Sequence, residues 1–169
     1  MLGKYHIWTL GCQMNKSDSE RVSAVLNKIG YEATDREPEA SLIVVNSCAV
    51  RQSAMDRIYG KAGNWQHLRR QGTLKTILTG CVLELDKAKL KDQFDLVVDI
   101  RDIGRLPQLL GHDLEMKVED YFDIKPAYNS KFQAFVPIMT GCDKFCTYCA
   151  VPYTRGREIS RPVQEFADA

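Results

Sequence analysis

The sequence has almost no excess of charge of either sign, because 23 Lys and Arg residues stand against 22 Asp and Glu residues among 169, leaving a formal net charge of +1. So small an excess gives no electrostatic indication of a nucleic-acid-binding surface. If RNA is a substrate, most of the charge that meets phosphate must lie elsewhere. The sequence also has no apolar run near the ~18 residues that a membrane-spanning helix needs, so we expect no membrane association.

Several functional signatures are also missing. The first residues lack the basic and apolar stretches of a secretory signal, so we expect a cytoplasmic and therefore reducing location. No Gly-x-Gly-x-x-Gly or P-loop pattern follows an expected strand, which argues against dinucleotide and nucleoside-triphosphate binding. Histidine is scarce, and His6, His67 and His112 lie in unrelated surroundings, where surface positions are expected rather than ligand roles.

Cysteine, in contrast, is present in six copies, and three of them, Cys142, Cys146 and Cys149, lie in one short segment. In a reducing compartment such cysteines are more often metal ligands than disulfide partners. A zinc site usually has a fourth ligand nearby in paired Cys or Cys/His form, and no histidine follows residue 112. Three thiolates can hold three corners of a cubane iron–sulfur cluster and leave the fourth iron open to an exogenous molecule. We therefore predict a cluster in this loop.

Strand-like and helix-like stretches alternate along the first part of the chain. Apolar runs predict strands and apolar residues at helical spacing predict helices. The expected strands are residues 5–10, 42–45, 76–79 and 94–98, and the expected helices are residues 17–29, 53–70, 84–91 and 103–110. Ser17 and Glu20 are expected to form a capping box for the first helix. Repeated β-α units of this length predict an α/β domain with a doubly wound parallel sheet.

The composition changes after residue 112. Residues 113–130 are rich in acidic residues and show weak periodicity, so we interpret them as a linker that follows a first domain at residues 1–112. An apolar strand expected at residues 132–139 then opens a second segment, residues 131–169, which contains the cysteine-rich loop. The sequence therefore predicts one domain, a linker and an incomplete second domain.

The remaining cysteines, Cys12, Cys48 and Cys81, each come just after an expected strand and before an expected helix. The strands of a parallel sheet point the same way, so these three loops should emerge at one edge, where open α/β sheets bind ligands. Three thiolates there, close to helix N-termini that favour anions, could hold a second cluster. Gly11 and Gly80 beside two of them suit a close approach to a bulky inorganic group. The alternative is that each cysteine is simply a small buried hydrophobic residue.

The 142–149 loop matches the Cys-x-x-x-Cys-x-x-Cys signature of radical S-adenosylmethionine enzymes, and the whole chain resembles their methylthiotransferase branch. The matching segments are TLGCQMN (9–15), NSCAVR (46–51), TGC (79–81) and GCDKFCTYCAVPYTRGRE (141–158). The residues after Cys12 and Cys48 look most like the members that convert N6-isopentenyladenosine at position 37 of tRNA to its 2-methylthio derivative. Members that act on threonylcarbamoyl-adenosine tend to have Lys-Val after the first cysteine, and those that act on a ribosomal protein tend to have Pro-Lys.

The resemblance implies two [4Fe-4S] clusters and S-adenosylmethionine as cofactors. The cluster that binds S-adenosylmethionine would be held by Cys142, Cys146 and Cys149, and the auxiliary cluster that presents the inserted sulfur by Cys12, Cys48 and Cys81. Tyr148 would lie against the adenine of S-adenosylmethionine, with a simple packing role as the alternative. The implied partners are a tRNA anticodon stem-loop and an electron donor such as flavodoxin or ferredoxin, and we expect a monomer.

Full-length members of this branch continue through the remainder of a partial α/β barrel and a small C-terminal β-barrel that grips tRNA. The resemblance therefore implies that residues 131–169 are the truncated start of a radical S-adenosylmethionine α/β barrel, and we expect the 169-residue polypeptide to be inactive alone. Arg155, Arg157 and Arg161 could meet phosphate or the cofactor carboxylate, or lie in an ordinary exposed loop. A methylthiotransferase for threonylcarbamoyl-adenosine or a ribosomal protein, and a non-catalytic metal-binding module, stay open as alternatives.

Overall fold

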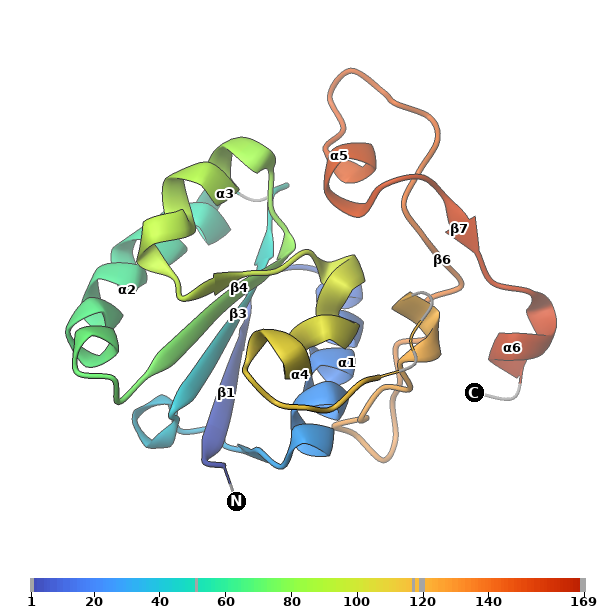
Figure 1. Cartoon of the computed structure of the whole chain (residues 1–169). Coiled ribbons are helices and arrows are strands. Elements are labelled where there is room, and N and C mark those ends of the chain that lie inside the picture. The colour runs from blue at the N-terminus through green and yellow to red at the C-terminus, as the bar shows by residue number, and fades with distance from the viewer. Residues whose placement is uncertain (1, 51, 117, 119–120, 168–169) are drawn as a thin grey trace.

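The computed structural model describes residues 2–50, 52–116, 118 and 121–167, which form an α/β fold around a parallel sheet (Figure 1). Five strands have the order β2-β1-β3-β4-β5, and every neighbouring pair is parallel. The strands are β1 (Lys4–Thr9), β2 (Glu32–Ala33), β3 (Leu42–Cys48), β4 (Lys75–Cys81) and β5 (Leu96–Val97). The predicted α/β class and the parallel sheet are therefore confirmed.

The strands β3 and β4 form the buried centre of the sheet. All seven residues of β3 are buried, as are six of the seven residues of β4. A strand that is covered on both faces has a continuous apolar run, which is why these two strands could be predicted from the sequence. Successive residues of β3 face opposite sides: Leu42 and Val44 join one core cluster, and Ile43 and Val45 join the other.

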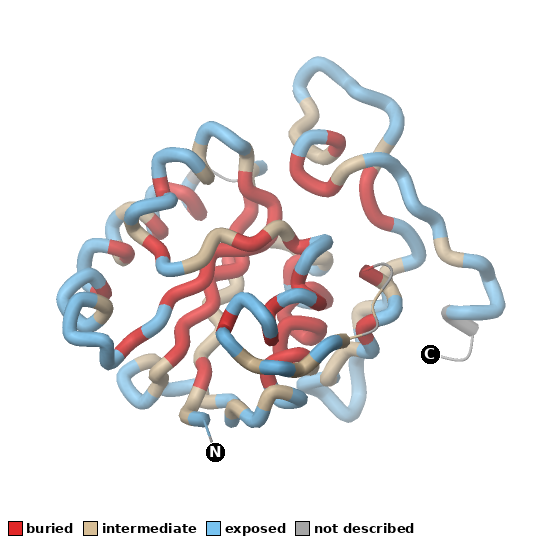
Figure 2. The backbone as a smooth tube through the Cα atoms, in the orientation of Figure 1, coloured by how far each residue is buried: buried red, intermediate tan, exposed pale blue. Residues whose placement is uncertain are grey.

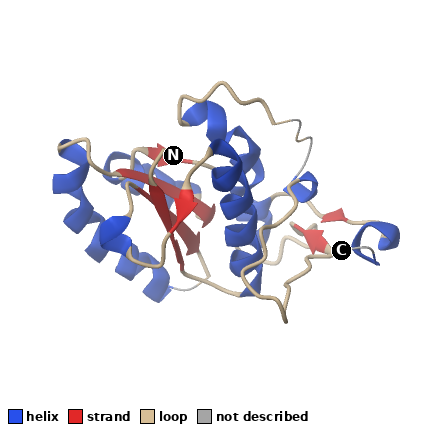
Figure 3. Ribbon diagram, turned by 90° about the horizontal axis from the view of Figure 1, so that it is seen from below, coloured by secondary structure: helices blue, strands red, loops and turns tan. Residues whose placement is uncertain are grey.

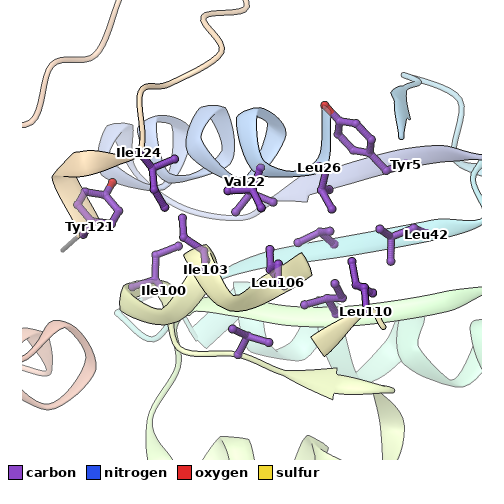
Figure 4. Packing of buried hydrophobic residues seen from close by; sticks show 14 residues of the cluster. Tyr5, Val22, Leu26, Leu42, Ile100, Ile103, Leu106, Leu110, Tyr121 and Ile124 are labelled. Carbon is purple, nitrogen blue, oxygen red and sulfur yellow. The ribbon is translucent and has the colours of Figure 1, made fainter. Parts of the chain in front are cut away.

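Helices cover both faces of the sheet (Figures 1 and 3). They are α1 (Gln13–Ile29), α2 (Gln52–Arg70), α3 (Glu84–Leu90) and α4 (Leu106–Leu109). On one side α1 and α4 contribute Val22 and Leu106 to the first core cluster (Figure 4), and on the other α2 and α3 contribute Ile58 and Leu90 to the second. Among the described residues, no helix has both the length and the apolar character needed to cross a bilayer. With both faces covered, the ends of the strands are where a ligand can approach the sheet.

Helix α1 begins earlier than predicted. Its N-cap is Cys12, whose backbone N–H donates to Asn15 Oδ1 at 3.1 Å, so the capping interaction lies here and not at Ser17 and Glu20. Ser17 and Glu20 are buried within the helix. Cysteine is not among the residues usually found at an N-cap, and this hid the true start of the helix in the sequence.

Three other elements also differ from the prediction. The helix expected at residues 103–110 is divided into a 3-10 helix, η3 (Ile100–Arg105), and α4, with Pro107 in the first turn of α4. Proline has no N–H to continue the preceding helix, but it suits a helix start. The strand expected at residues 94–98 is shortened to β5. The edge strand β2 was not predicted, because its two exposed residues show no periodicity.

Part of the segment predicted as a linker, residues 113–130, packs on the first core cluster. The 3-10 helix η4 (Tyr121–Asp123) follows the sheet domain, and Tyr121 and Ile124 are only 4% and 3% exposed. Figure 4 shows both side chains at the end of the cluster near Val22. This stretch is therefore held on the domain that precedes it, while the domain boundaries themselves stay a prediction.

The last described residues contain only short elements and are mostly exposed (Figure 2). They are β6 (Met139–Thr140), α5 (Val151–Arg155), β7 (Ile159–Ser160) and α6 (Val163–Ala167), with β6 and β7 antiparallel. The strand expected at residues 132–139 was wrong for residues 132–138, which form no strand. Only Met139 and Thr140 pair with β7, which is itself two residues long. The start of an α/β barrel at residues 131–169 stays a prediction.

Candidate metal centre at the carboxyl edge of the sheet

Two of the predicted ligands end neighbouring strands. Cys48 is the last residue of β3 and Cys81 the last residue of β4, and they are partners in the strand register. Paired residues of parallel strands have their side chains on the same face of the sheet. Both residues are buried, with 5% and 8% exposure. The structure therefore brings Cys48 and Cys81 together at the carboxyl edge.

Cys12 reaches the same edge from β1, the neighbour of β3 on the other side. The strand register pairs Thr9 with Asn46, and the backbone N–H of Leu10 then donates to the Asn46 carbonyl at 2.8 Å. Cys12 follows two residues later as the half-buried N-cap of α1. The N-terminus of a helix carries a partial positive charge, so Cys12 lies at the positive end of α1.

A pair of buried asparagines links the Cys12 turn to the end of β3. Asn15 accepts the Cys12 N–H and lies 3.5 Å from Cys12 Sγ, while its own amide donates to Asn46 Oδ1 at 3.0 Å and to the Ser47 carbonyl at 2.9 Å. Both asparagines are fully buried. Buried amides with satisfied hydrogen bonds are rigid supports. Neither asparagine was predicted as a site residue, although each lies within three positions of a cysteine.

The glycines beside the cysteines allow the protein backbone to pack closely, whereas their close approach to an inorganic group stays a prediction. Gly80 has a φ of +94°, and a Cβ there would lie 2.5 Å from the Ser47 carbonyl oxygen and collide with Asn46. A Cβ at Gly11 would collide with Asn15. Each glycine therefore lets one cysteine-bearing turn pack against the asparagine pair.

Arg155, at the end of α5, makes a contact that the sequence did not indicate. Its Nε donates to Cys81 Sγ at 3.0 Å, and its guanidinium forms an ion pair with Asp18 of α1 at 2.6 Å. We expected Arg155 to meet an external anion or lie in an exposed loop, but its side chain is only 6% exposed. The sequence around Arg155 gives no signal for its partners, because Cys81 and Asp18 lie 74 and 137 positions away.

The charges around Cys81 act in opposite directions. Burial raises the pKa of the Cys81 thiol, and the positive charge of Arg155 works against that rise. Burial alone would lower the pKa of Arg155, but the Asp18 carboxylate outweighs it and raises that pKa above its ordinary value. Arg155 therefore stays charged beside the sulfur.

The second cysteine set lies in an exposed loop that precedes α5 (Figures 1 and 2). Cys142 and Cys149 are half-buried and Cys146 is exposed. The Cys149 N–H donates to the Cys146 carbonyl at 3.0 Å, and Phe145 between the cysteines has a φ of +48°. Tyr148 is 90% exposed, so its ring is free to meet a ligand.

The two cysteine sets have the donor chemistry of an iron–sulfur protein. All six cysteines are free thiols. In the described part of the chain, no three His, Cys, Asp or Glu side chains converge closely enough to hold a single metal ion. The thiolates of a cubane cluster bind separate iron corners, so three cysteines of this kind are compatible with such a cluster.

Comparison with known proteins places this edge within a family. Residues 4–100, which include Cys12, Cys48 and Cys81, match the family described as "Uncharacterized protein family UPF0004". The chain belongs to this family. Family membership therefore covers the sheet domain and its three edge cysteines, whereas the 142–149 loop lies outside the matched residues.

Similarity to individual proteins extends further along the chain. A protein from Dictyoglomus thermophilum named tRNA-2-methylthio-N(6)-dimethylallyladenosine synthase is 39% identical over 177 residues, with 96% of this chain and 40% of that protein covered. Proteins of the same name from Halalkalibacterium halodurans and Albidiferax ferrireducens are 41% and 39% identical, and cover 96% and 98% of this chain. The chain spans only 33% and 39% of those two relatives. These matches take in the 142–149 loop as well.

Proposed function

We propose that the chain is the cysteine-bearing N-terminal part of a tRNA methylthiotransferase that modifies C2 of N6-isopentenyladenosine at position 37. The observation that carries this proposal is the meeting of three cysteine-bearing turns at one sheet edge, with Cys48 and Cys81 in register and Cys12 beside them. The names of the relatives support the substrate, and their similarity covers both cysteine sets.

Each cysteine set would hold one [4Fe-4S] cluster. The auxiliary cluster would take Cys12, Cys48 and Cys81, and the cluster that binds S-adenosylmethionine would take Cys142, Cys146 and Cys149. When bound, these groups would supply one-electron chemistry and inorganic sulfide, neither of which amino-acid side chains provide. The protein supplies the thiolates, the orientation and the exclusion of water.

The described side chains fit these supporting roles. Asn15 fixes the Cys12 turn against the end of β3, so the spacing of the first set is set by buried amides. Helix α5 and Arg155 cover Cys81 and keep solvent from it. Tyr148 is exposed directly before Cys149, where its ring can lie against the adenine of S-adenosylmethionine.

The finer assignments belong to the same proposal. Residues 131–169 would begin the α/β barrel, and the tRNA anticodon stem-loop would be gripped mainly by regions beyond this chain. The charge balance supports this division, because a net charge of +1 leaves little basic surface for phosphate. Flavodoxin or ferredoxin would donate electrons to a monomeric cytoplasmic enzyme, and the 169-residue chain alone would not turn over tRNA.

Anaerobic reconstitution with iron and sulfide tests the proposal. The chain should bind about eight irons, four for each cluster. Replacing Cys12, Cys48 and Cys81 together by alanine should remove about half of this iron, and the matched triple replacement of Cys142, Cys146 and Cys149 should remove the other half. S-adenosylmethionine should change the electron paramagnetic resonance spectrum of the reduced chain only when the second set is intact. Loss of all iron in either variant, or stoichiometric zinc in its place, would sink the two-cluster assignment.

A further inference from the structure

Arg155 joins the segment after the second cysteine set to the edge that carries the first. Its two Nη atoms lie 2.6 and 3.3 Å from the Asp18 carboxylate oxygens, and its Nε lies 3.0 Å from Cys81 Sγ. Asp18 belongs to α1 and Cys81 ends β4, so one side chain connects three elements. We call Arg155, Asp18, Tyr121 and Cys81 the Arg155 clamp.

The clamp is buried, and the carboxylate is satisfied from two sides. Asp18 is fully buried and also accepts the hydroxyl hydrogen of Tyr121 at 2.6 Å. The guanidinium of Arg21 lies 4.6 Å from the centre of the Tyr121 ring. The Asp18 carboxylate therefore accepts hydrogen bonds from both Arg155 and Tyr121, and the Arg21 guanidinium lies over the Tyr121 ring.

This arrangement favours a role in fixing the positions of the elements that it joins. A buried ion pair adds little net stability compared with apolar side chains, but removal of one partner leaves an uncompensated buried charge. The planar fork of arginine can direct three N–H groups at fixed angles, which a lysine cannot do. Because Arg155 follows Cys149 by six positions, its anchoring restricts where the second cysteine loop can lie.

We propose that Arg155 is a positioning residue that clamps α5 to the carboxyl edge of the sheet and so sets the placement of one cysteine set relative to the other. This step needs no bound metal, because the contacts exist between protein atoms. It predicts that α5 loses its fixed position when the fork is removed, while the sheet stays folded.

A second consequence rests on the function proposed above. If Cys81 is a ligand of the auxiliary cluster, the N–H···S bond from Arg155 and its positive charge favour the reduced, more negative form of that cluster. Removal of Arg155 then leaves Asp18 as an unpaired negative charge nearby. The reduction potential of the auxiliary cluster should fall.

Hydrogen–deuterium exchange on the iron-free 169-residue chain tests the clamp itself. The amides of Tyr153 and Thr154, which both donate to the Ala150 carbonyl, report on α5. Arg155→Gln should raise their exchange rates about tenfold or more. Without the contacts of Arg155, the free energy of local opening of α5 falls, and a tenfold change in rate corresponds to about 1.4 kcal/mol. Amides of β3 should keep their protection, which shows that the sheet is intact.

Arg157→Gln is the matched control. Arg157 lies two positions away on the same segment, but its side chain is 72% exposed and pairs with Asp143 on the surface. Its replacement should leave exchange at Tyr153 and Thr154 within twofold of the parent. Should Arg155→Gln unfold the whole chain, Arg155→Lys takes its place, because it keeps a positive charge beside Asp18 but cannot direct three N–H groups at fixed angles, and it should still speed exchange in α5.

Redox titration of reconstituted chains tests the second consequence. In a chain whose Cys142, Cys146 and Cys149 are replaced by alanine, Arg155→Gln should lower the midpoint potential of the remaining cluster, and Arg157→Gln should not. Unchanged exchange in α5 would overturn the clamp. Faster exchange with an unchanged potential would overturn the link to the cluster alone. A chain that binds no iron would contradict the proposed function, while the exchange experiment would still decide the clamp.

Discussion

Asn15 and Asn46 hydrogen-bond to each other in both directions beneath the cysteine edge. The Asn15 amide donates to Asn46 Oδ1 at 3.0 Å, and the Asn46 amide donates to the Asn15 carbonyl at 2.7 Å. One residue lies in the first turn of α1 and the other near the end of β3. The placement of Cys12 relative to Cys48 therefore depends on the packing of α1 against β3.

Replacing Asn46 by alanine should destabilise the iron-free chain by about 1–3 kcal/mol, because the buried Asn15 would lose one of the two acceptors of its amide and the donor to its carbonyl. Thermal or urea unfolding followed by circular dichroism measures the change. Asn64→Ala is the matched control, since Asn64 is exposed on α2 and its loss should stay within about 0.5 kcal/mol. Equal stability of the two variants would show that the asparagine pair is not a support.

Replacing Gly80 by alanine should destabilise the chain by more than about 1–2 kcal/mol. The backbone there is left-handed, which alone costs about that much for a residue with a Cβ, and the new methyl would also clash with Ser47 and Asn46. Gly60→Ala is the contrasting variant, because Gly60 lies in α2 with open space around it. That change should stabilise the helix by roughly 0.5–1 kcal/mol. Urea unfolding of both variants should therefore give shifts of opposite sign.

The Asp95 carboxylate makes stability depend on pH in the acid range. Burial alone would raise the pKa of Asp95, but hydrogen bonds from Arg69 and Thr76 outweigh it and hold the pKa below its ordinary value. A depressed pKa contributes stability above the unfolded pKa of about 3.9, and this contribution is lost as pH falls through the lower folded value.

Asp95→Asn should therefore reduce stability at neutral pH and flatten the dependence of stability on pH below about 4. Denaturant unfolding at a series of pH values measures both effects. Asp35→Asn serves as the comparison, because Asp35 is exposed after β2 and its replacement should change the dependence of stability on pH less than Asp95→Asn does. A parallel loss of acid stability in parent and Asp95→Asn chains would refute this account.

The thiols should differ in their reactivity toward an alkylating reagent in the iron-free chain. Cys146 is exposed, whereas Cys48 and Cys81 are 5% and 8% exposed. A bulky maleimide should label Cys146 first and the two buried thiols only when the structure opens. Peptide mass spectrometry over time gives the order. Early labelling of Cys48 would mean that the carboxyl edge is open in solution.

Much of the sheet could be predicted from sequence because its signals are local. The apolar runs of β3 and β4 and the helical spacing in α1 and α2 need no knowledge of distant residues. Elements with weak local signals were missed or misplaced, namely β2, the start of α1 and the region at residues 132–138. The start of α1 was misplaced because cysteine is unusual at an N-cap, and β2 was missed because its two exposed residues show no periodicity.

The sequence by itself determined the order of strands and helices, and with it the fact that Cys12, Cys48 and Cys81 follow strands that point the same way. Parallel strand direction is enough to bring their turns to one edge. Only the tertiary structure decided what surrounds those thiols. The Asn15–Asn46 pair and the contacts of Arg155 with Asp18 and Cys81 join positions far apart in the chain. Such contacts arise when the apolar faces of the helices pack on the sheet, and no periodicity in the sequence records which polar groups then meet.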